Sequence, residues 1–479
     1  MSNRPMPRGA AAYAAPPAVF IPPAVKSTPV HPAFYLTVAF VFVVYARFPE
    51  ILDMLTGSVL HMARVLMVLA FVSAVLFGGS MRAVFSKIGI GMLVFTAWMC
   101  VCVPFSVWRG GSARAIRDYW ILSLFSFVII AASVQGLDQC RRMMYTLGAA
   151  TAFIELFTIL IGRVQAGRMA LLGGTLGNAN YLAMMLLMGV PFCLLAVRTK
   201  PPVSLLRLVN LLAVLAIPVS VAGTGSRGAL VALGLMFLLY FIPLPPSQKL
   251  VSAIVALILA VVAITWSARS ALDRYKTMFI DSGDVHLTDS ERSAIDSSGL
   301  RKQLLLSSLE LTLQHPLMGV GPGMFAVANA DYTQETKGQP SWNAWHETHN
   351  TFTQLSCEDG LPGLFFYCVT LLLCFRVSFV LPRRAADNPA LSAVGPMALS
   401  LRLSLIAFTV TALFTSNAYA YYFPMLAGVC VAFERAVTTE LAAAAGGAKP
   451  ETGPQPPAWT RVRMPRNGNA VARKNGAPR

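Results

Sequence analysis

The sequence has 479 residues, of which 56% are hydrophobic and only 12% charged, and its mean hydropathy is +0.62. A soluble globular chain carries roughly a quarter charged residues, and here the charge is missing from long stretches, so a water-soluble protein is excluded. The formal net charge is +17. Because the chain has no nucleic-acid-binding motif, we attribute this charge to Lys and Arg beside anionic membrane lipids and expect no nucleic-acid partner.

Apolar runs long enough to cross roughly 30 Å of hydrocarbon as helices recur along the chain. They predict an all-α polytopic membrane protein with about 12 transmembrane helices and one large extracytoplasmic loop. Nine spans are expected in residues 33–267 and three in residues 361–434, and the loop, with short helices, in residues 268–360. The predicted spans are 33–48, 62–79, 88–106, 118–135, 143–162, 180–197, 205–222, 228–243, 250–267, 361–381, 398–416 and 418–434.

Both termini are rich in Pro, Ala and basic residues, and we interpret residues 1–32 and 435–479 as disordered tails. An even number of spans places both tails on one side, and their Lys and Arg residues make that side cytoplasmic by the positive-inside rule. In a bacterial cell this membrane is the cytoplasmic (inner) membrane, and the long loop then faces the periplasm or exterior. The loops expected on the same side are also basic, with Arg82, Lys87, Arg141, Arg142, Arg198, Lys200, Lys249, Arg383 and Arg384.

The short outward loops carry arginine and no lysine, which is unusual for that side. These residues are Arg109, Arg114, Arg163, Arg168 and Arg227, with Arg117 at the start of the next span. Arginine offers a planar fork that matches phosphate in two-point fashion. The cluster indicates a phosphate-bearing ligand on the outward face, although contact with lipid headgroups or snorkelling at helix ends would also explain it.

Two short segments between spans have a composition that suits ligand binding. In Thr224-Gly225-Ser226-Arg227-Gly228, glycine allows close backbone approach, Ser226 can donate a hydrogen bond, and the turn opens a helix whose N-terminal N–H groups favour an anion. In Gly177-Asn178-Ala179-Asn180-Tyr181, Asn178 and Asn180 either cap the next helix or bind sugar hydroxyls, and capping is the simpler interpretation.

The long loop divides into three parts. Residues 281–299 are rich in Asp and Ser and are expected to be flexible, whereas residues 300–314 have Leu at helical spacing and predict a surface helix that ends at Pro316. Gly319, Gly321 and Gly323 then predict an irregular turn.

The last part of the loop holds a histidine pair, His346 and His349, just before the next span. Helical spacing would place both on one face. Neutral imidazole is a natural general base near physiological pH, whereas metal ligation and a structural role are the alternatives. The spacing does not match HExxH, and the chain has no DxD pair to hold a metal on a nucleotide sugar.

The stretch His349-Asn350-Thr351-Phe352-Thr353-Gln354-Leu355, followed by Glu358, Gly360 and Gly363, resembles the hallmark of the O-antigen ligase and polymerase superfamily. Three further segments are similar to family motifs: the Thr224–Gly228 turn, the Gly177–Ala183 segment, and Gly299–Arg301 followed by His315–Gly321. The resemblance covers roughly residues 170–385 and, more loosely, the whole layout of spans.

This resemblance implies a membrane-embedded glycosyltransferase that needs no metal or other cofactor. Its donor would be a glycan on undecaprenyl diphosphate, and its acceptor a hydroxyl of lipid A core, another glycan or a protein. The resemblance places the catalytic base on His349 and diphosphate contacts on Arg227 and on Arg163 or Arg168. His346, which the resemblance does not assign, is a second candidate catalytic residue, and Arg301 is a further candidate diphosphate contact. Ser226, Asn350, Asn178, Asn180 and Glu358 would position these groups or bind glycan.

A polymerase or an O-oligosaccharyltransferase of the same family is the nearest alternative to a ligase. A transporter or flippase would also suit about twelve spans, and Glu155 and Arg402 are the ionisable residues within spans that such a protein would use. However, the long loop is not central and the chain shows no internal repeat, so transport is the weaker interpretation.

Overall fold

The computed structural model describes residues 31–57, 62–77, 80–165, 167–171, 174–266, 289–337 and 346–447. The chain divides into two units, residues 1–438 and 439–479, and of the second unit only the end of the last helix is described. The arrangement described below is that of the first unit. The predicted N-terminal tail lies almost entirely outside the described residues.

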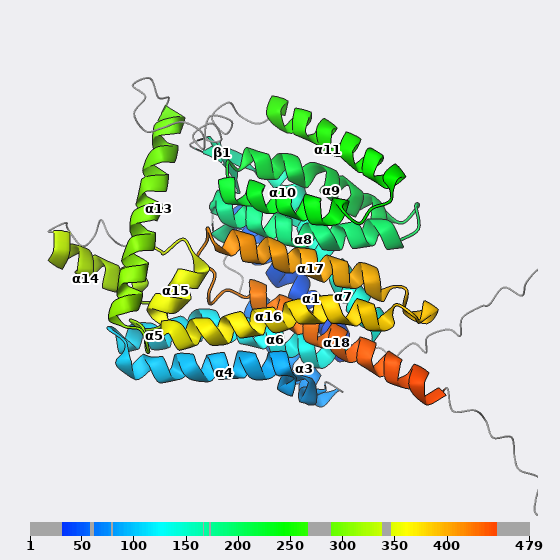
Figure 1. The fold of residues 1–479 in the computed structure, drawn as a ribbon, viewed down its shortest axis with the longest axis horizontal. Coiled ribbons are helices and arrows are strands. Elements are labelled where there is room, and N and C mark those ends of the chain that lie inside the picture. Colours follow the sequence, from blue (N-terminus) through cyan, green and yellow to red (C-terminus); the bar gives the residue numbers. More distant parts are fainter. Residues whose placement is uncertain are drawn as a thin grey trace, which may run out of the picture. The chain divides into compact units, whose positions relative to one another are not determined.

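The first unit is built of helices, most of which run along a common direction (Figure 1). Eight helical segments in the described part of the chain are long and apolar enough to cross a membrane. They are α4 with η2 (Lys87–Phe105), α5 to α6 (Arg109–Ser133), α7 (Leu137–Ile161), α8 (Ala179–Thr199), α9 (Leu205–Gly223), α11 (Pro246–Trp266), α16 (Gly360–Ala385) and η6 with α17 (Pro389–Ala412).

The four remaining predicted spans also fall on helices. Three are shorter apolar helices: α1 (Pro32–Tyr45), α3 (Met62–Leu76) and α10 (Arg227–Phe241). The fourth is α18 (Tyr422–Gly447), a continuous helix whose apolar run ends at the charged residues Glu434 and Arg435. The protein is therefore a mostly helical, polytopic membrane protein, and the count of twelve spans stays a prediction.

Three of the eight long segments contain more than one element: η2 (Val103–Phe105) ends the first, α5 (Arg109–Ala115), η3 (Ile116–Trp120) and α6 (Ile121–Ser133) form the second, and η6 (Pro389–Leu391) precedes α17 (Val394–Ala412) in the last. Shorter elements lie between the spans, namely α2 (Phe48–Thr56), η1 (Met81–Phe85), the antiparallel strands β1 (Arg163–Gln165) and β2 (Arg168–Ala170), and η4 (Thr175–Gly177). The hairpin of β1 and β2 is a small exception to the all-α prediction.

The core of the bundle lies around α8, which packs against α7, α9, α10 and α17. Glycines let these helices approach closely: a Cβ on Gly189 would meet the Thr151 side chain, and one on Gly148 would meet the backbone at Phe192. Small residues at such contacts let apolar helices pack in lipid, where water expulsion does not drive association. This packing fixes the end of α8 at which Asn178 and Asn180 lie.

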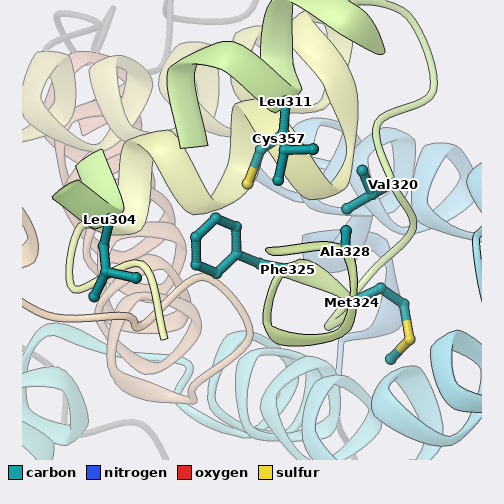
Figure 2. Close-up of a cluster of buried hydrophobic side chains, with 7 residues drawn as sticks. All are labelled: Leu304, Leu311, Val320, Met324, Phe325, Ala328 and Cys357. Atoms are coloured by element: carbon teal, nitrogen blue, oxygen red, sulfur yellow. The ribbon is translucent and has the colours of Figure 1, made fainter. Parts of the chain in front are cut away.

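The long loop folds into three helices, α13 (Asp289–Gln314), α14 (Phe325–Lys337) and α15 (Thr351–Glu358), and α13 runs across the direction of the bundle helices (Figure 1). The helices share a small apolar core, which Figure 2 shows. Its members are Leu304, Leu311, Val320, Met324, Phe325, Ala328 and Cys357.

Four sequence-based expectations are wrong in detail. Arg109 and Arg114 lie in the continuous helix Arg109–Ser133 and not in a loop, because arginine is a good helix former whose long stem carries its charge to the surface. Arg141 and Arg142 likewise lie inside α7, where Asp138 in the first turn pairs with both.

Residues 289–299 are helical rather than flexible, because they extend the Leu-patterned helix α13 toward its N-terminus; residues 281–288 lie outside the described residues. At the C-terminus, α18 continues to Gly447, past the predicted tail boundary at residue 435, since Leu441 to Ala445 are strong helix formers.

Candidate active site

The Thr224–Gly228 turn joins α9 to α10 and fixes the place of Arg227. Gly225 has φ +61°, a left-handed conformation that glycine adopts without steric cost. The Ser226 amide donates to Thr224 Oγ1 at 3.3 Å, and both side chains are buried. Arg227 is the first residue of α10 and is half-buried. Its guanidinium therefore lies at a helix N-terminus, where backbone N–H groups already favour an anion.

Arg168 on strand β2 joins this turn to the start of α8. Its Nε donates to the Thr224 carbonyl at 3.0 Å and its Nη2 donates to Asn180 Oδ1 at 2.7 Å. Asn178 is the N-cap of α8, with Oδ1 accepting from the Asn180 amide at 2.9 Å, so the capping interpretation of Asn178 holds. Arg163 is exposed on the paired strand β1 of the same hairpin. Arg168 thus positions the turn of Arg227 relative to α8.

His349 lies in a strained segment just before α15. Its φ is +53°, a left-handed conformation that costs a side-chain-bearing residue about 1–3 kcal/mol and is concentrated at functional sites. Asn350 is the N-cap of α15, and its Oδ1 accepts from the amides of Phe352 at 2.9 Å and Thr353 at 3.2 Å. The expected helical spacing of His346 and His349 is therefore wrong, because Asn350 starts the helix after them.

The electrostatic surroundings of His349 keep its imidazole neutral. Burial lowers its pKa most, and Arg301 and His346 act in the same direction, so that the pKa of His349 is about 4. Arg301, on α13, and His346 therefore lie near enough to act electrostatically on His349. A neutral imidazole at pH 7 has a nitrogen lone pair ready to accept a proton.

The loop between α17 and α18, residues 413–421, links the arginine turn to the histidine segment. Ser416 Oγ accepts the His349 amide at 2.9 Å and lies 3.1 Å from Thr348 Oγ1. Two residues earlier, the Phe414 ring covers Gly228, where a Cβ would meet it at 2.3 Å. Both predicted parts of the site therefore pack on this 413–421 loop, which the sequence analysis had divided between two spans.

Tyr181 adds a contact between the start of α8 and the histidine segment. Its hydroxyl lies 3.1 Å from Glu347 Oε2 and 3.0 Å from the Ser416 carbonyl. Tyr181 directly follows Asn180, so one turn of α8 contacts Arg168 on one side and the His346–Asn350 segment on the other. Neither Tyr181 nor Ser416 was singled out from the sequence. The position of Tyr181 inside the Gly-Asn-x-Asn segment was the available signal, whereas Ser416 offered none.

The glycine turn of the long loop and the Glu358–Gly360 stretch form one packed unit. A Cβ on Gly319 would lie 2.3 Å from the Glu358 carbonyl, and one on Gly360 would lie 2.0 Å from the Leu317 carbonyl. The Gly321 amide donates to the Glu358 carbonyl at 2.9 Å. Only glycine fits at these contacts, and all three glycines have positive φ. The two sequence motifs are therefore two sides of one structural contact.

Glu358 has a structural place within that unit. Its side chain is buried, and Oε1 accepts the Phe325 amide at the start of α14 at 2.9 Å. Burial raises the pKa of Glu358 to about 7, although the hydrogen bonds that it accepts lower it. The neighbouring Asp359 accepts from the Tyr419 hydroxyl at 2.8 Å, which ties this unit to the 413–421 loop. Glu358 and Asp359 thereby fix the direction of α15, and with it His349.

The structure therefore brings most of the predicted residues to one end of the bundle. The Arg168 hydrogen bonds join the Arg227 turn to Asn180, and Ser416 with Tyr181 joins that region to His349 and His346. Arg163 lies in the same hairpin as Arg168 but is exposed. In the described residues, no three His, Cys, Asp or Glu side chains gather as a metal site would require, and independence from metals stays a prediction.

Two comparisons with known proteins bear on this arrangement. A search of curated proteins found no match. Residues 211–368 match the family model described as O-Antigen ligase, and this segment runs from α9 through the Arg227 turn, the long loop and α15 into α16. Over this segment the match confirms the resemblance stated from the motifs: residues 211–368 are similar to the O-antigen ligase family.

Proposed function

We propose that this protein transfers a glycan from an undecaprenyl-diphosphate donor to a hydroxyl acceptor on the periplasmic face of the bacterial inner membrane. The chain would cross that membrane about twelve times with both tails in the cytoplasm. The single observation that carries the proposal is the gathering of the arginine turn and the neutral, strained His349 around one loop, in a segment matched by the O-antigen ligase family.

His349 is the proposed general base. Its imidazole would take the proton of the acceptor hydroxyl while that oxygen attacks the anomeric carbon of the donor sugar. The bond between this carbon and the diphosphate oxygen breaks, and undecaprenyl diphosphate leaves with the electron pair. General-base catalysis of this kind contributes about 10²–10⁴-fold. His346 would act beside His349 as its electrostatic neighbour, and Asn350 would orient His349 through the helix cap.

The proposed diphosphate site uses Arg227, with Arg168, Arg301 and Arg163 as further contacts. Positive groups aimed at the leaving diphosphate stabilise the charge that develops on it in the transition state. The donor would also act on the base: a diphosphate beside Arg301 offsets the charge that lowers the pKa of His349. Donor binding would therefore raise the basicity of His349 at the step that needs it.

A surface-polysaccharide polymerase or an O-oligosaccharyltransferase would use the same donor chemistry with a different acceptor. These alternatives separate cleanly in a deletion strain analysed for surface glycan. Loss of a ligase leaves long chains unattached, loss of a polymerase leaves single repeats, and loss of an oligosaccharyltransferase leaves glycoproteins bare. A polysaccharide flippase, the least supported alternative, would leave the lipid-linked donor on the cytoplasmic side.

The chemistry itself is tested with purified protein, lipid-diphosphate-linked glycan and the acceptor identified in this way. We expect His349→Ala to abolish transfer, and Arg227→Lys to reduce it strongly because lysine cannot reproduce the two-point fork. Thr409→Ala, which removes only a hydroxyl bonded within α17, is the matched control. Transfer by His349→Ala at the wild-type rate would remove the base from the mechanism.

A further inference from the structure

A second polar cavity lies at the other end of the same helices. It has a volume of about 530 Å³ and is lined by Asp138, Arg141, Arg142, Tyr145, Lys200 and Leu206. The first four belong to the beginning of α7, Lys200 follows the end of α8, and Leu206 is at the beginning of α9. The candidate active site is at the opposite ends of α8 and α9. Since α8 has 21 residues at 1.5 Å each, roughly 30 Å separates the two.

The residues that line the cavity carry more positive than negative charge, and contacts among them hold their side chains in place. Asp138 pairs with Arg141 at 2.7 Å and with Arg142 at 2.7 Å, which holds both guanidinium groups at the cavity. Lys200 Nζ lies 4.5 Å from the centre of the Tyr145 ring, and the Tyr145 hydroxyl is 2.6 Å from Thr199 Oγ1. Three cations and one carboxylate thus line the cavity. The surplus of positive charge, in a pocket with an aromatic wall, suits an anion with an apolar part.

An apolar surface leads away from this cavity along α9. Leu205, Leu208 and Leu212 are 73%, 52% and 60% exposed, one turn apart on the helix that begins at the cavity. In a membrane protein such a face lies against acyl chains. The cations therefore lie where the headgroups of the leaflet opposite the candidate active site are expected, and this is the face that the positive-inside rule makes cytoplasmic.

The geometry points to a binding site for the phosphodiester of an anionic phospholipid, of the phosphatidylglycerol type, in the cavity between α7, α8 and α9. Arg142 and Lys200 contact the phosphate, Arg141 is held beside it by Asp138, and the acyl chains lie along the exposed leucines of α9. Basic pockets between transmembrane helices on the cytoplasmic side are a known way to bind such headgroups. The bound lipid would bridge α7, α8 and α9. At their opposite ends lie the β1–β2 hairpin with Arg168, which follows α7, and Asn180 and Thr224 on α8 and α9.

The test uses the full-length protein, purified in a neutral detergent and freed of native lipid. Binding is followed by native mass spectrometry and by the midpoint of thermal unfolding, with phosphatidylglycerol, phosphatidylcholine and inorganic phosphate as separate additions. The double variant Arg142→Gln with Lys200→Gln removes two cations from the cavity. Its control, Arg198→Gln with Lys249→Gln, removes two cations from the same end of the bundle that do not line the cavity, because they contact Gln248, Tyr240 and Phe241.

We expect phosphatidylglycerol to bind and raise the unfolding midpoint, and phosphatidylcholine and inorganic phosphate to do neither. The cavity double variant should bind it about 30-fold more weakly, from about 1 kcal/mol for each cation at a membrane surface, and the control should bind it as wild type does. If both double variants bound phosphatidylglycerol equally weakly, the binding would be due to general charge attraction, and the proposed site would be wrong. An equal response to phosphatidylcholine or to inorganic phosphate would overturn the anionic phospholipid as its ligand.

Discussion

Ser416→Ala tests whether the 413–421 loop positions the base. Ser416 Oγ accepts the amide of His349 and lies within hydrogen-bonding distance of Thr348 Oγ1, so alanine removes both contacts at once. His349 has a left-handed backbone, which persists only where the surroundings fix it. Without the Ser416 hydroxyl, this segment can relax toward an ordinary conformation, and the imidazole moves away from the acceptor.

The size of the effect follows from these contacts. A neutral hydrogen bond contributes about 0.5–1.5 kcal/mol, and two of them together about 1–3 kcal/mol. If this energy holds His349 in place for the transition state, then 1.36 kcal/mol for each tenfold in rate predicts a loss of about 5-fold to 150-fold in transfer. The loss should appear mainly in kcat, since the diphosphate contacts are unchanged.

The assay is transfer from the lipid-diphosphate donor to the acceptor, at saturating donor, with unfolding midpoints measured on the same preparations. Ser416→Thr keeps the hydroxyl and should recover most of the activity. Thr409→Ala removes a hydroxyl bonded within its own helix α17 and should leave transfer unchanged. If folded Ser416→Ala transfers glycan as fast as wild type, the loop does not position His349 and the argument above is wrong.

Three further predictions address the charged groups. Burial lowers the pKa of His349 to about 4 with a further contribution from the charge of Arg301, and Arg301→Gln removes that contribution. The acidic limb of the kcat/KM profile should therefore move to higher pH, so that activity falls more at pH 5 than at pH 8. A uniform loss would leave Arg301 a diphosphate contact only. Arg168→Lys should reduce the rate of transfer at least tenfold, because it loses the two hydrogen bonds by which Arg168 links Thr224 to Asn180. Arg163→Lys, on an exposed strand of the same hairpin, should reduce the rate less. Equal effects of the two variants would contradict a positioning role for Arg168. Glu358→Gln should remove a pH dependence of stability. Because burial raises the pKa of Glu358 from 4.5 to about 7, the contribution of this group to the free energy of unfolding is present below pH 4.5 and is lost as pH rises through 7, up to about 3 kcal/mol. The wild type should therefore lose more stability than the variant between pH 5 and pH 8, and an equal loss in both would refute this.

The sequence was most informative where one physical constraint dominates. Lipid demands long apolar helices, so each predicted span falls on a helix, with ends displaced where charged residues continue a helix, as at Arg109 before α6. Glycine motifs were equally informative, because Gly319, Gly321 and Gly360 have conformations or contacts that leave no room for a side chain.

The sequence was least informative where a role depends on residues distant in the chain. Ser416 is an ordinary serine at the end of an apolar run, and only the packing of α17 beside α8 brings its hydroxyl to His349. The histidine pair was misplaced on a helix for the opposite reason: a local pattern, the three-residue spacing, was given more weight than Asn350, whose side chain starts α15 after both histidines.

The boundary of the segment that matches the family separates residues with proposed chemical roles from residues that hold them in place. Residues 211–368 contain Arg227, Arg301 and His349, the groups to which the proposed chemistry belongs. The groups that hold them in place, namely Arg168, Asn180 and Ser416, lie outside that segment, on the hairpin, on α8 and on the loop before α18. Reactive groups are restricted to a few residue types in each position, whereas a supporting hydrogen bond can be supplied by many. The segment that the family model matches is therefore smaller than the physical unit that forms the candidate site, and that unit is the helical bundle around α8.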